Sequence, residues 1–171
     1  EMVSGTQDGL SALGMAKVDI LGFDACLMSD VAVAAAMSGF SDWMIASPET
    51  APFLGWDYGA FDAVIKDPML AADKLGSVIV ERYKTAVEAE KKQIWTLALI
   101  NSSKIPPVLQ ALSGVATAME AVVAPGGSDD KARDAMVKAV AETRGDVQTF
   151  GAEAKKKQNG LTVSVPGSKE V

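Results

Sequence analysis

The chain has 171 residues, of which 49% are hydrophobic and 22% are charged, and its formal net charge is -6. A nucleic-acid partner is not expected, because binding to phosphates requires clustered lysine and arginine. No apolar run reaches the roughly 18 residues of a membrane span, so no membrane partner is expected. A chain of this length can bury a core without a disulfide or a structural metal.

The first predicted elements are a strand and a helix. Residues 17–23 form a short, mostly apolar run with β-branched members, which is typical of a strand buried on both faces of a parallel sheet. Ser29 and Asp30 are candidate caps for an alanine- and valine-rich helix that ends near Gly39. The order of strand and then helix predicts a βα unit.

The middle of the chain repeats this order. Residues 42–47 predict a second strand, and two prolines and a glycine make residues 48–55 an irregular loop. Residues 56–66 predict a short helix. Asp67 and Pro68 then suggest the cap and first turn of a longer helix, whose apolar side chains lie three and four residues apart: Leu75, Val78, Ile79 and Tyr83.

Residues 95–100 predict a third strand, after which Ser102 or Ser103 caps a long amphipathic helix that ends before Pro125. A further helix is expected from Asp129 to about Val147, and a last strand over 161–165. The sequence thus predicts an α/β three-layer fold with a mostly parallel sheet. Four strands are few for such a sheet, so we expect further strands from polypeptide that precedes Glu1.

Cys26 is the candidate nucleophile. It is the one cysteine of a chain that has no histidine, and it follows the first predicted strand. The carboxyl ends of strands in α/β folds are where functional residues gather, but a thiol needs a neighbouring base to become a good nucleophile. The alternative is an inert buried thiol, which is what lone cysteines usually are.

Several segments resemble motifs of the clostripain family of cysteine peptidases. They are Asp24-Ala25-Cys26-Leu27-Met28 behind an apolar strand, Ser47-x-Glu49-Thr50, Gly55-Trp56-Asp57-Tyr58, Ile79-Val80-Glu81-Arg82-Tyr83, Asn101-Ser102-Ser103-Lys104-Ile105 and Gly160-Leu161-Thr162-Val163-Ser164-Val165-Pro166. The resemblance covers residues 13 to 166. It implies a caspase-like fold and a Cys-His dyad that hydrolyses peptide bonds, with the histidine N-terminal to the cysteine.

Members of this family commonly cut themselves between the histidine and the cysteine. The resemblance therefore implies that residues 1–171 are the C-terminal, heavy-chain part of one peptidase domain, whose partner is an N-terminal light chain of the same precursor. Glu1 is then either a maturation cut or an arbitrary boundary. Peptide or protein substrates and a secreted or periplasmic location are implied too. The alternative is an inactive pseudo-peptidase or a regulatory binding module on the same fold.

The resemblance also implies the substrate-binding residues. Asp24 matches a carboxylate that lines the primary specificity pocket and pairs with Arg or Lys, although it could equally cap loop amides. Ser47, Glu49 and Thr50 are expected at the pocket rim or, alternatively, as ordinary turn caps. Leu54 stands where family members with basic specificity carry Asp, and Ala51 where an acidic residue is common, so the preference could be weaker or altered.

Trp56 and Tyr58 could form a platform on which a ligand stacks, but a Trp beside Gly at a helix start is expected to pack as an anchor instead. No cofactor is predicted, and no metal either, because nothing in the chain has the ligand spacing of a calcium-binding loop.

Overall fold

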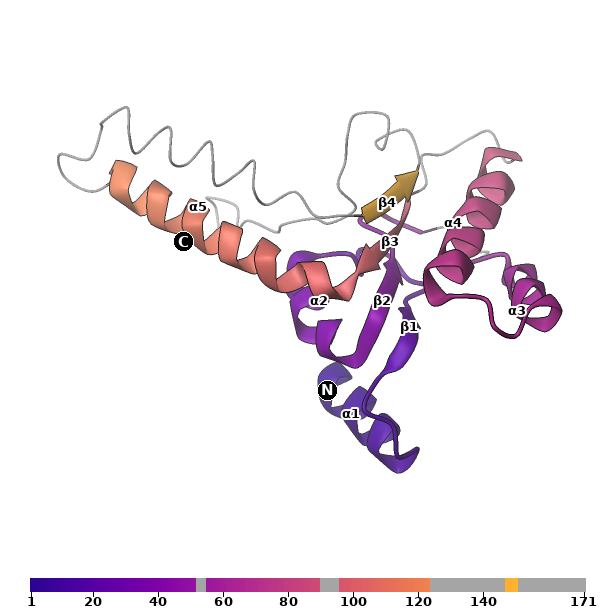
Figure 1. Cartoon of the computed structure of the whole chain (residues 1–171). Coiled ribbons are helices and arrows are strands. Elements are labelled where there is room, and N and C mark those ends of the chain that lie inside the picture. The colour runs from indigo at the N-terminus through magenta and orange to yellow at the C-terminus, as the bar shows by residue number, and fades with distance from the viewer. Residues whose placement is uncertain (52–54, 90–95, 124–146, 151–171) are drawn as a thin grey trace.

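The structure is a computed structural model, and it describes residues 1–51, 55–89, 96–123 and 147–150. Its centre is a sheet of four strands in the order β1-β2-β3-β4 (Figure 1). The strands are β1 (Val18–Gly22), β2 (Ser41–Ala46), β3 (Leu97–Asn101) and β4 (Val147–Phe150). Within the described part of the chain, β1 therefore forms one edge of the sheet.

The sheet is mixed, so the prediction of a mostly parallel sheet was wrong for the strands described. β1 and β2 pair in parallel, but β3 runs antiparallel to both β2 and β4. Alternation of strands and helices along the sequence does not by itself fix strand direction. Several helical pieces lie between β2 and β3, and a connection of that length can bring the chain to either end of the sheet.

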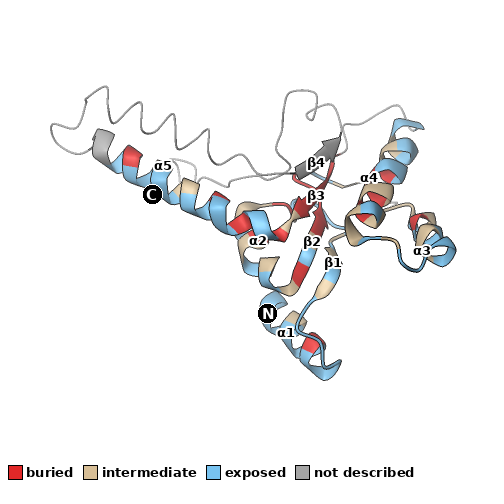
Figure 2. Ribbon diagram, in the orientation of Figure 1, coloured by how far each residue is buried: buried red, intermediate tan, exposed pale blue. Residues whose placement is uncertain are grey.

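Helices cover both faces of the sheet. In Figure 1, α2 (Val31–Met37) and α5 (Ile105–Val123) lie on one side, and α3 (Asp62–Lys66) and α4 (Ala72–Ala89) lie on the other. Most residues of β2 and β3 are buried between these two layers of helices (Figure 2). The predicted α/β class and the three-layer arrangement are therefore confirmed.

The two sides of the sheet form separate hydrophobic clusters. Ile45 of β2 faces α4, whereas its neighbour Met44 faces α2 and α5. Leu99 and Ile100 of β3 divide in the same way. This alternation follows from the pleat, which turns successive side chains to opposite faces. Strands with both faces covered lose the polar positions of a surface strand, which explains the continuous apolar runs in the sequence.

The helix starts are partly as predicted. Asp30 caps α2 by accepting a hydrogen bond from the amide of Ala32. The predicted cap at Asp67 and Pro68 was wrong, since these residues lie in a turn and α4 begins at Ala72. Before α5, Asn101 rather than Ser102 or Ser103 provides the cap, by accepting the amide of Ser103 at the start of the 3-10 turn η3 (Ser102–Lys104).

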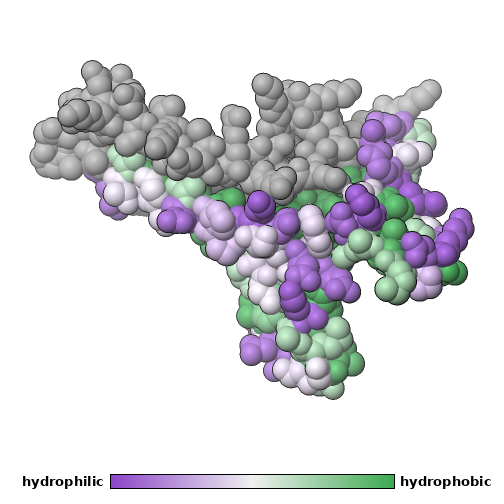
Figure 3. Space-filling view, in the orientation of Figure 1, coloured by the Kyte–Doolittle hydropathy of each residue, from purple (hydrophilic) through white to green (hydrophobic). Residues whose placement is uncertain are grey.

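Two elements were not predicted. Helix α1 (Met2–Ala12) contains Gly5 and Gly9, which lower helix propensity, and its exposed hydrophobic surface is visible in Figure 3. Val147 begins β4, where the sequence suggested the end of a helix. The rest of that helix and the strand over 161–165 lie outside the described residues. No described helix is both long and apolar enough to cross a bilayer.

Candidate functional site

Cys26 lies in a tight turn directly after β1, and its thiol is exposed. Its sulfur accepts a hydrogen bond from the backbone amide of Ala51, at 3.2 Å, and lies 3.8 Å from the Ala51 carbonyl oxygen. The alternative of a buried thiol is therefore wrong for this structure.

Two backbone hydrogen bonds attach the turn to the segment after β2. The amide of Leu27 donates to the carbonyl of Glu49, and the amide of Ser29 donates to the carbonyl of Ser47, both at 3.0 Å. Leu27 adopts a left-handed conformation with φ of 59°. This costs a residue with a side chain about 1–2 kcal/mol. Strain of this kind concentrates at functional sites, where the surrounding contacts maintain it.

Ser47 anchors the start of the loop that contacts the Cys26 turn. It is buried, and its hydroxyl contacts Thr96 at 3.0 Å and the backbone of Glu49. These contacts fit the turn-capping alternative, in which Ser47 shapes the loop that attaches to the Cys26 turn. Glu49 and Thr50 are exposed on the same loop.

Asp24 lies opposite the segment that follows the irregular loop. Its Oδ2 atom accepts two hydrogen bonds of 3.0 Å, one from the amide of Trp56 and one from the hydroxyl of Tyr58. Gly55 makes this approach possible. It has φ of +69°, and a Cβ atom there would lie 2.5 Å from Asp24 Oδ2.

Asp24 and Cys26 both lie beyond the end of β1 at Gly22, so the alternation of side chains along a strand does not apply to them. Instead, Asp24 faces residues 55–58 and Cys26 faces Ala51. Because the two residues are only two positions apart in the chain, their Cα atoms can be at most about 7 Å apart.

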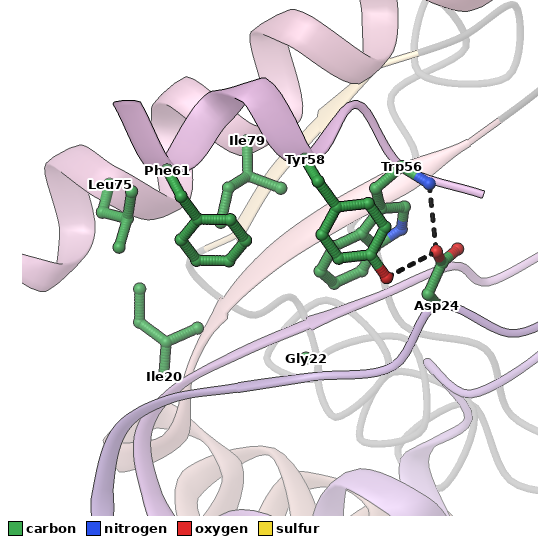
Figure 4. A pocket seen from close by; sticks show the side chains of 8 residues that line it. All are labelled: Ile20, Gly22, Asp24, Trp56, Tyr58, Phe61, Leu75 and Ile79. Atoms are coloured by element: carbon green, nitrogen blue, oxygen red, sulfur yellow. Dashed lines mark hydrogen bonds between the residues drawn. The ribbon is translucent and has the colours of Figure 1, made fainter. Parts of the chain in front are cut away.

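A pocket of about 250 Å³ begins at Asp24 and follows β1 towards α4 (Figure 4). Apart from Asp24 and the Tyr58 hydroxyl, its lining is apolar and aromatic, with Ile20, Gly22, Trp56, Phe61, Leu75 and Ile79. The Trp56 ring packs against β1 at Gly22, where a Cβ atom would come within 2.7 Å of it. Trp56 thus has the predicted anchoring role, whereas Tyr58 is largely exposed and directs its hydroxyl to Asp24 (Figure 4).

An ion pair fixes the segment that carries Tyr58. Asp57 caps the 3-10 turn η2 (Tyr58–Phe61) by accepting the Gly59 amide, and its other oxygen binds Arg82 of α4 at 2.7–2.8 Å. The Tyr58 ring stacks on Phe61, with ring centroids 6.2 Å apart. The position of the Tyr58 hydroxyl is therefore set by contacts to α4 as well as by Asp24.

Two tyrosines respond to the charge of this site. The pKa of Tyr58 is raised above its ordinary value, chiefly because its hydroxyl donates to the Asp24 carboxylate. The pKa of Tyr83, buried on α4, is also raised, first by desolvation and then by the negative charges of Asp24 and Cys26. Both phenols therefore stay protonated at neutral pH.

The sequence did not identify Gly55, Asp57 or Arg82 as parts of the site. Gly55 could have been suspected, since glycine next to an irregular loop often has positive φ. Leu54 lies outside the described residues. Ala51 contributes its backbone rather than its side chain. Among the described residues, no three acidic, cysteine or histidine side chains gather as a metal site would require.

Comparisons with known proteins agree on one family. The family model described as the clostripain family matches residues 3–161. No curated protein sequence matches the chain.

Several solved structures match the fold, with 15–18% sequence identity. A clostripain from Bacteroides thetaiotaomicron in complex with a peptide inhibitor superposes with a TM-score of 0.66 at 15% identity, over 96% of this chain and 85% of that one. A secreted C11 cysteine protease from the same species gives 0.62 at 15%, over 91% and 52%. An inactive zymogen C11 protease from Parabacteroides distasonis gives 0.56 at 18%, over 95% and 57%.

Proposed function

The chain belongs to the clostripain family, and on that premise we propose that it carries the nucleophile of a cysteine endopeptidase, with Cys26 as the attacking residue. The observation that supports this most strongly is the exposed sulfur at the carboxyl end of β1, which a backbone amide approaches at 3.2 Å. A structural thiol would be enclosed by apolar side chains. Residues 1–171 then form the C-terminal part of a single peptidase domain.

The proposed reaction proceeds through an acyl-enzyme. Cys26 attacks the scissile carbonyl, and its own backbone amide helps to bind the oxyanion. A histidine takes the thiol proton and gives it to the leaving amine, after which water hydrolyses the thioester. Residues 1–171 contain no histidine, so this group has to come from outside them.

We assign that histidine to an N-terminal light chain, produced when the precursor cuts itself. The position of β1 supports this assignment, because its outer edge pairs with no other described strand and can accept one from a partner. A secreted or periplasmic location fits a peptidase of this kind. One structural relative is itself a secreted protease.

The substrate class we propose is a peptide or protein with a basic residue before the scissile bond. Asp24 supports it, as a carboxylate at the mouth of a pocket beside the nucleophile. Glu49 and Thr50, exposed on the loop that supports Cys26, are proposed rim residues, and Ser47 is proposed to position that loop.

A covalent peptidyl inhibitor with a basic side chain tests this function in the full-length precursor and its matured form. We expect labelling at Cys26, peptide hydrolysis, and loss of both in Cys26→Ala with an unchanged circular dichroism spectrum. An alkylating agent without a peptide is the control, since it reports thiol exposure alone. Hydrolysis that persists in Cys26→Ala contradicts the proposal. A folded two-chain protein that is neither labelled nor active supports a pseudo-peptidase or binding module instead.

A further inference from the structure

We propose that Tyr58 is a specificity-determining residue which, by occupying one oxygen of Asp24, makes the site prefer lysine over arginine before the scissile bond. This inference rests on the proposed peptidase function and refines it. It depends on how the two oxygens of a single carboxylate are used.

The Oδ2 atom of Asp24 is already saturated. It accepts the Trp56 amide and the Tyr58 hydroxyl, each at 3.0 Å (Figure 4). A carboxylate oxygen has about two lone-pair positions, so both positions of Oδ2 are taken. Among the described residues, no hydrogen bond goes to Oδ1. Asp24 therefore offers a substrate one free oxygen rather than two.

Lysine and arginine differ in what they need from a carboxylate. The guanidinium group presents a planar fork of donors that matches both oxygens at once, and most of its advantage over lysine comes from this paired geometry. The ammonium group is a compact charge with three rotatable donors, which a single oxygen can bind well. With Oδ2 occupied, an arginine would leave one arm of its fork without a partner at Asp24.

The described lining of the pocket offers no second carboxylate. Asp24 is the one charged residue among the described residues that line it, and the remainder of the lining is apolar or aromatic apart from the Tyr58 hydroxyl. These walls can pack against the methylene stem that both basic side chains share. Discrimination between the two therefore depends on the charged end and on Asp24.

Tyr58 keeps this arrangement across the working pH range. Its pKa is raised, so its hydroxyl remains a donor at neutral pH. Its ring is fixed by stacking on Phe61, and its segment is fixed by the ion pair of Asp57 with Arg82. The Oδ2 atom is thus occupied before any substrate arrives.

The test is hydrolysis by the matured two-chain protein of three peptides that differ only before the scissile bond, with lysine, arginine or norleucine. One unmade hydrogen bond to a charged group corresponds to roughly a tenfold to hundredfold difference in kcat/KM. We expect kcat/KM for the lysine peptide to exceed that for the arginine peptide by this factor. The norleucine peptide should be cut at least about tenfold more slowly than the lysine peptide, because norleucine lacks the ammonium group.

Variants separate specificity from structural support. Tyr58→Phe keeps the ring and frees one position on Oδ2, so kcat/KM for arginine should rise and the ratio of lysine to arginine should fall by about tenfold. Asp24→Asn should lower kcat/KM for both basic substrates. Met69→Ala, at a side chain that is 90% exposed, is the control and should leave the ratio unchanged.

The outcomes distinguish this inference from the proposed function. Hydrolysis in which arginine equals or exceeds lysine overturns the inference and leaves the peptidase function intact. Equal loss of both basic substrates in Tyr58→Phe overturns it too, because that pattern indicates structural support alone. An absence of both hydrolysis and inhibitor labelling contradicts the peptidase function itself.

Discussion

Replacement of Gly55 by alanine should disrupt the contact between Asp24 and the segment after the irregular loop. Two effects add. A residue with a side chain at φ of +69° costs about 1–2 kcal/mol. The new Cβ would also lie 2.5 Å from Asp24 Oδ2, which displaces the carboxylate from the Trp56 amide and the Tyr58 hydroxyl. At this exposed position the lost hydrogen bonds are worth about 1 kcal/mol together, so the total is about 2–3 kcal/mol.

Urea denaturation of the full-length protein measures this cost, with Gly39→Ala as the matched control. An added Cβ at Gly39 meets no atom within 4 Å, so that variant should change the free energy of unfolding by less than about 1 kcal/mol. A double-mutant cycle with Asp24→Ala isolates the steric part. In that background Gly55→Ala should cost only the backbone strain. An equal cost in both backgrounds would refute the proposed clash.

Further predictions concern the neighbours of this contact. In urea denaturation, Asp57→Ala should destabilise the protein by about 1–1.5 kcal/mol, whereas Arg82→Ala should destabilise it by about 0.5 kcal/mol. The difference arises because Asp57 caps η2 in addition to forming the exposed ion pair, whereas Arg82 only forms the ion pair. Phenol absorbance should show Tyr58 ionising above pH 10, and Asp24→Asn should lower that pKa. Because the folded-state pKa of Tyr58 is raised, its contribution to stability is complete below pH 10 and declines as pH rises through the folded pKa. Leu27→Gly should raise the melting temperature slightly, because the strain that glycine relieves at this positive φ costs more free energy than the extra conformational entropy that glycine has in the unfolded chain. A lower melting temperature would contradict this prediction.

The elements that could be predicted from sequence are those whose signal is local. β2 and β3 appear as apolar runs because both of their faces are buried, and α4 shows the spacing of a single buried stripe. β1 was also predicted to be buried on both faces, but its residues are only half-buried or exposed because it lies at the edge of the described sheet. Strand direction could not be predicted, because it depends on how the long connection between β2 and β3 returns to the sheet. The start of α4 was misplaced because Asp-Pro is typical both of a helix start and of a turn.

The same division applies to the site. The position of Cys26 after an apolar strand follows from local pattern, and the structure places it in the turn after β1. The partners of Asp24 could not be predicted, because they come from residues more than thirty positions away that a glycine with positive φ brings close. Local sequence identifies which residues carry reactive groups, whereas the folded loops decide what those groups touch.

A crystal structure of the matured two-chain protein with a covalent peptidyl inhibitor tests the central claim most directly. The account predicts a bond between the inhibitor and the sulfur of Cys26, with a histidine nitrogen of the N-terminal chain within hydrogen-bonding reach of that centre. A structure in which the sulfur is unmodified and enclosed by apolar side chains, with no imidazole near it, would contradict the account.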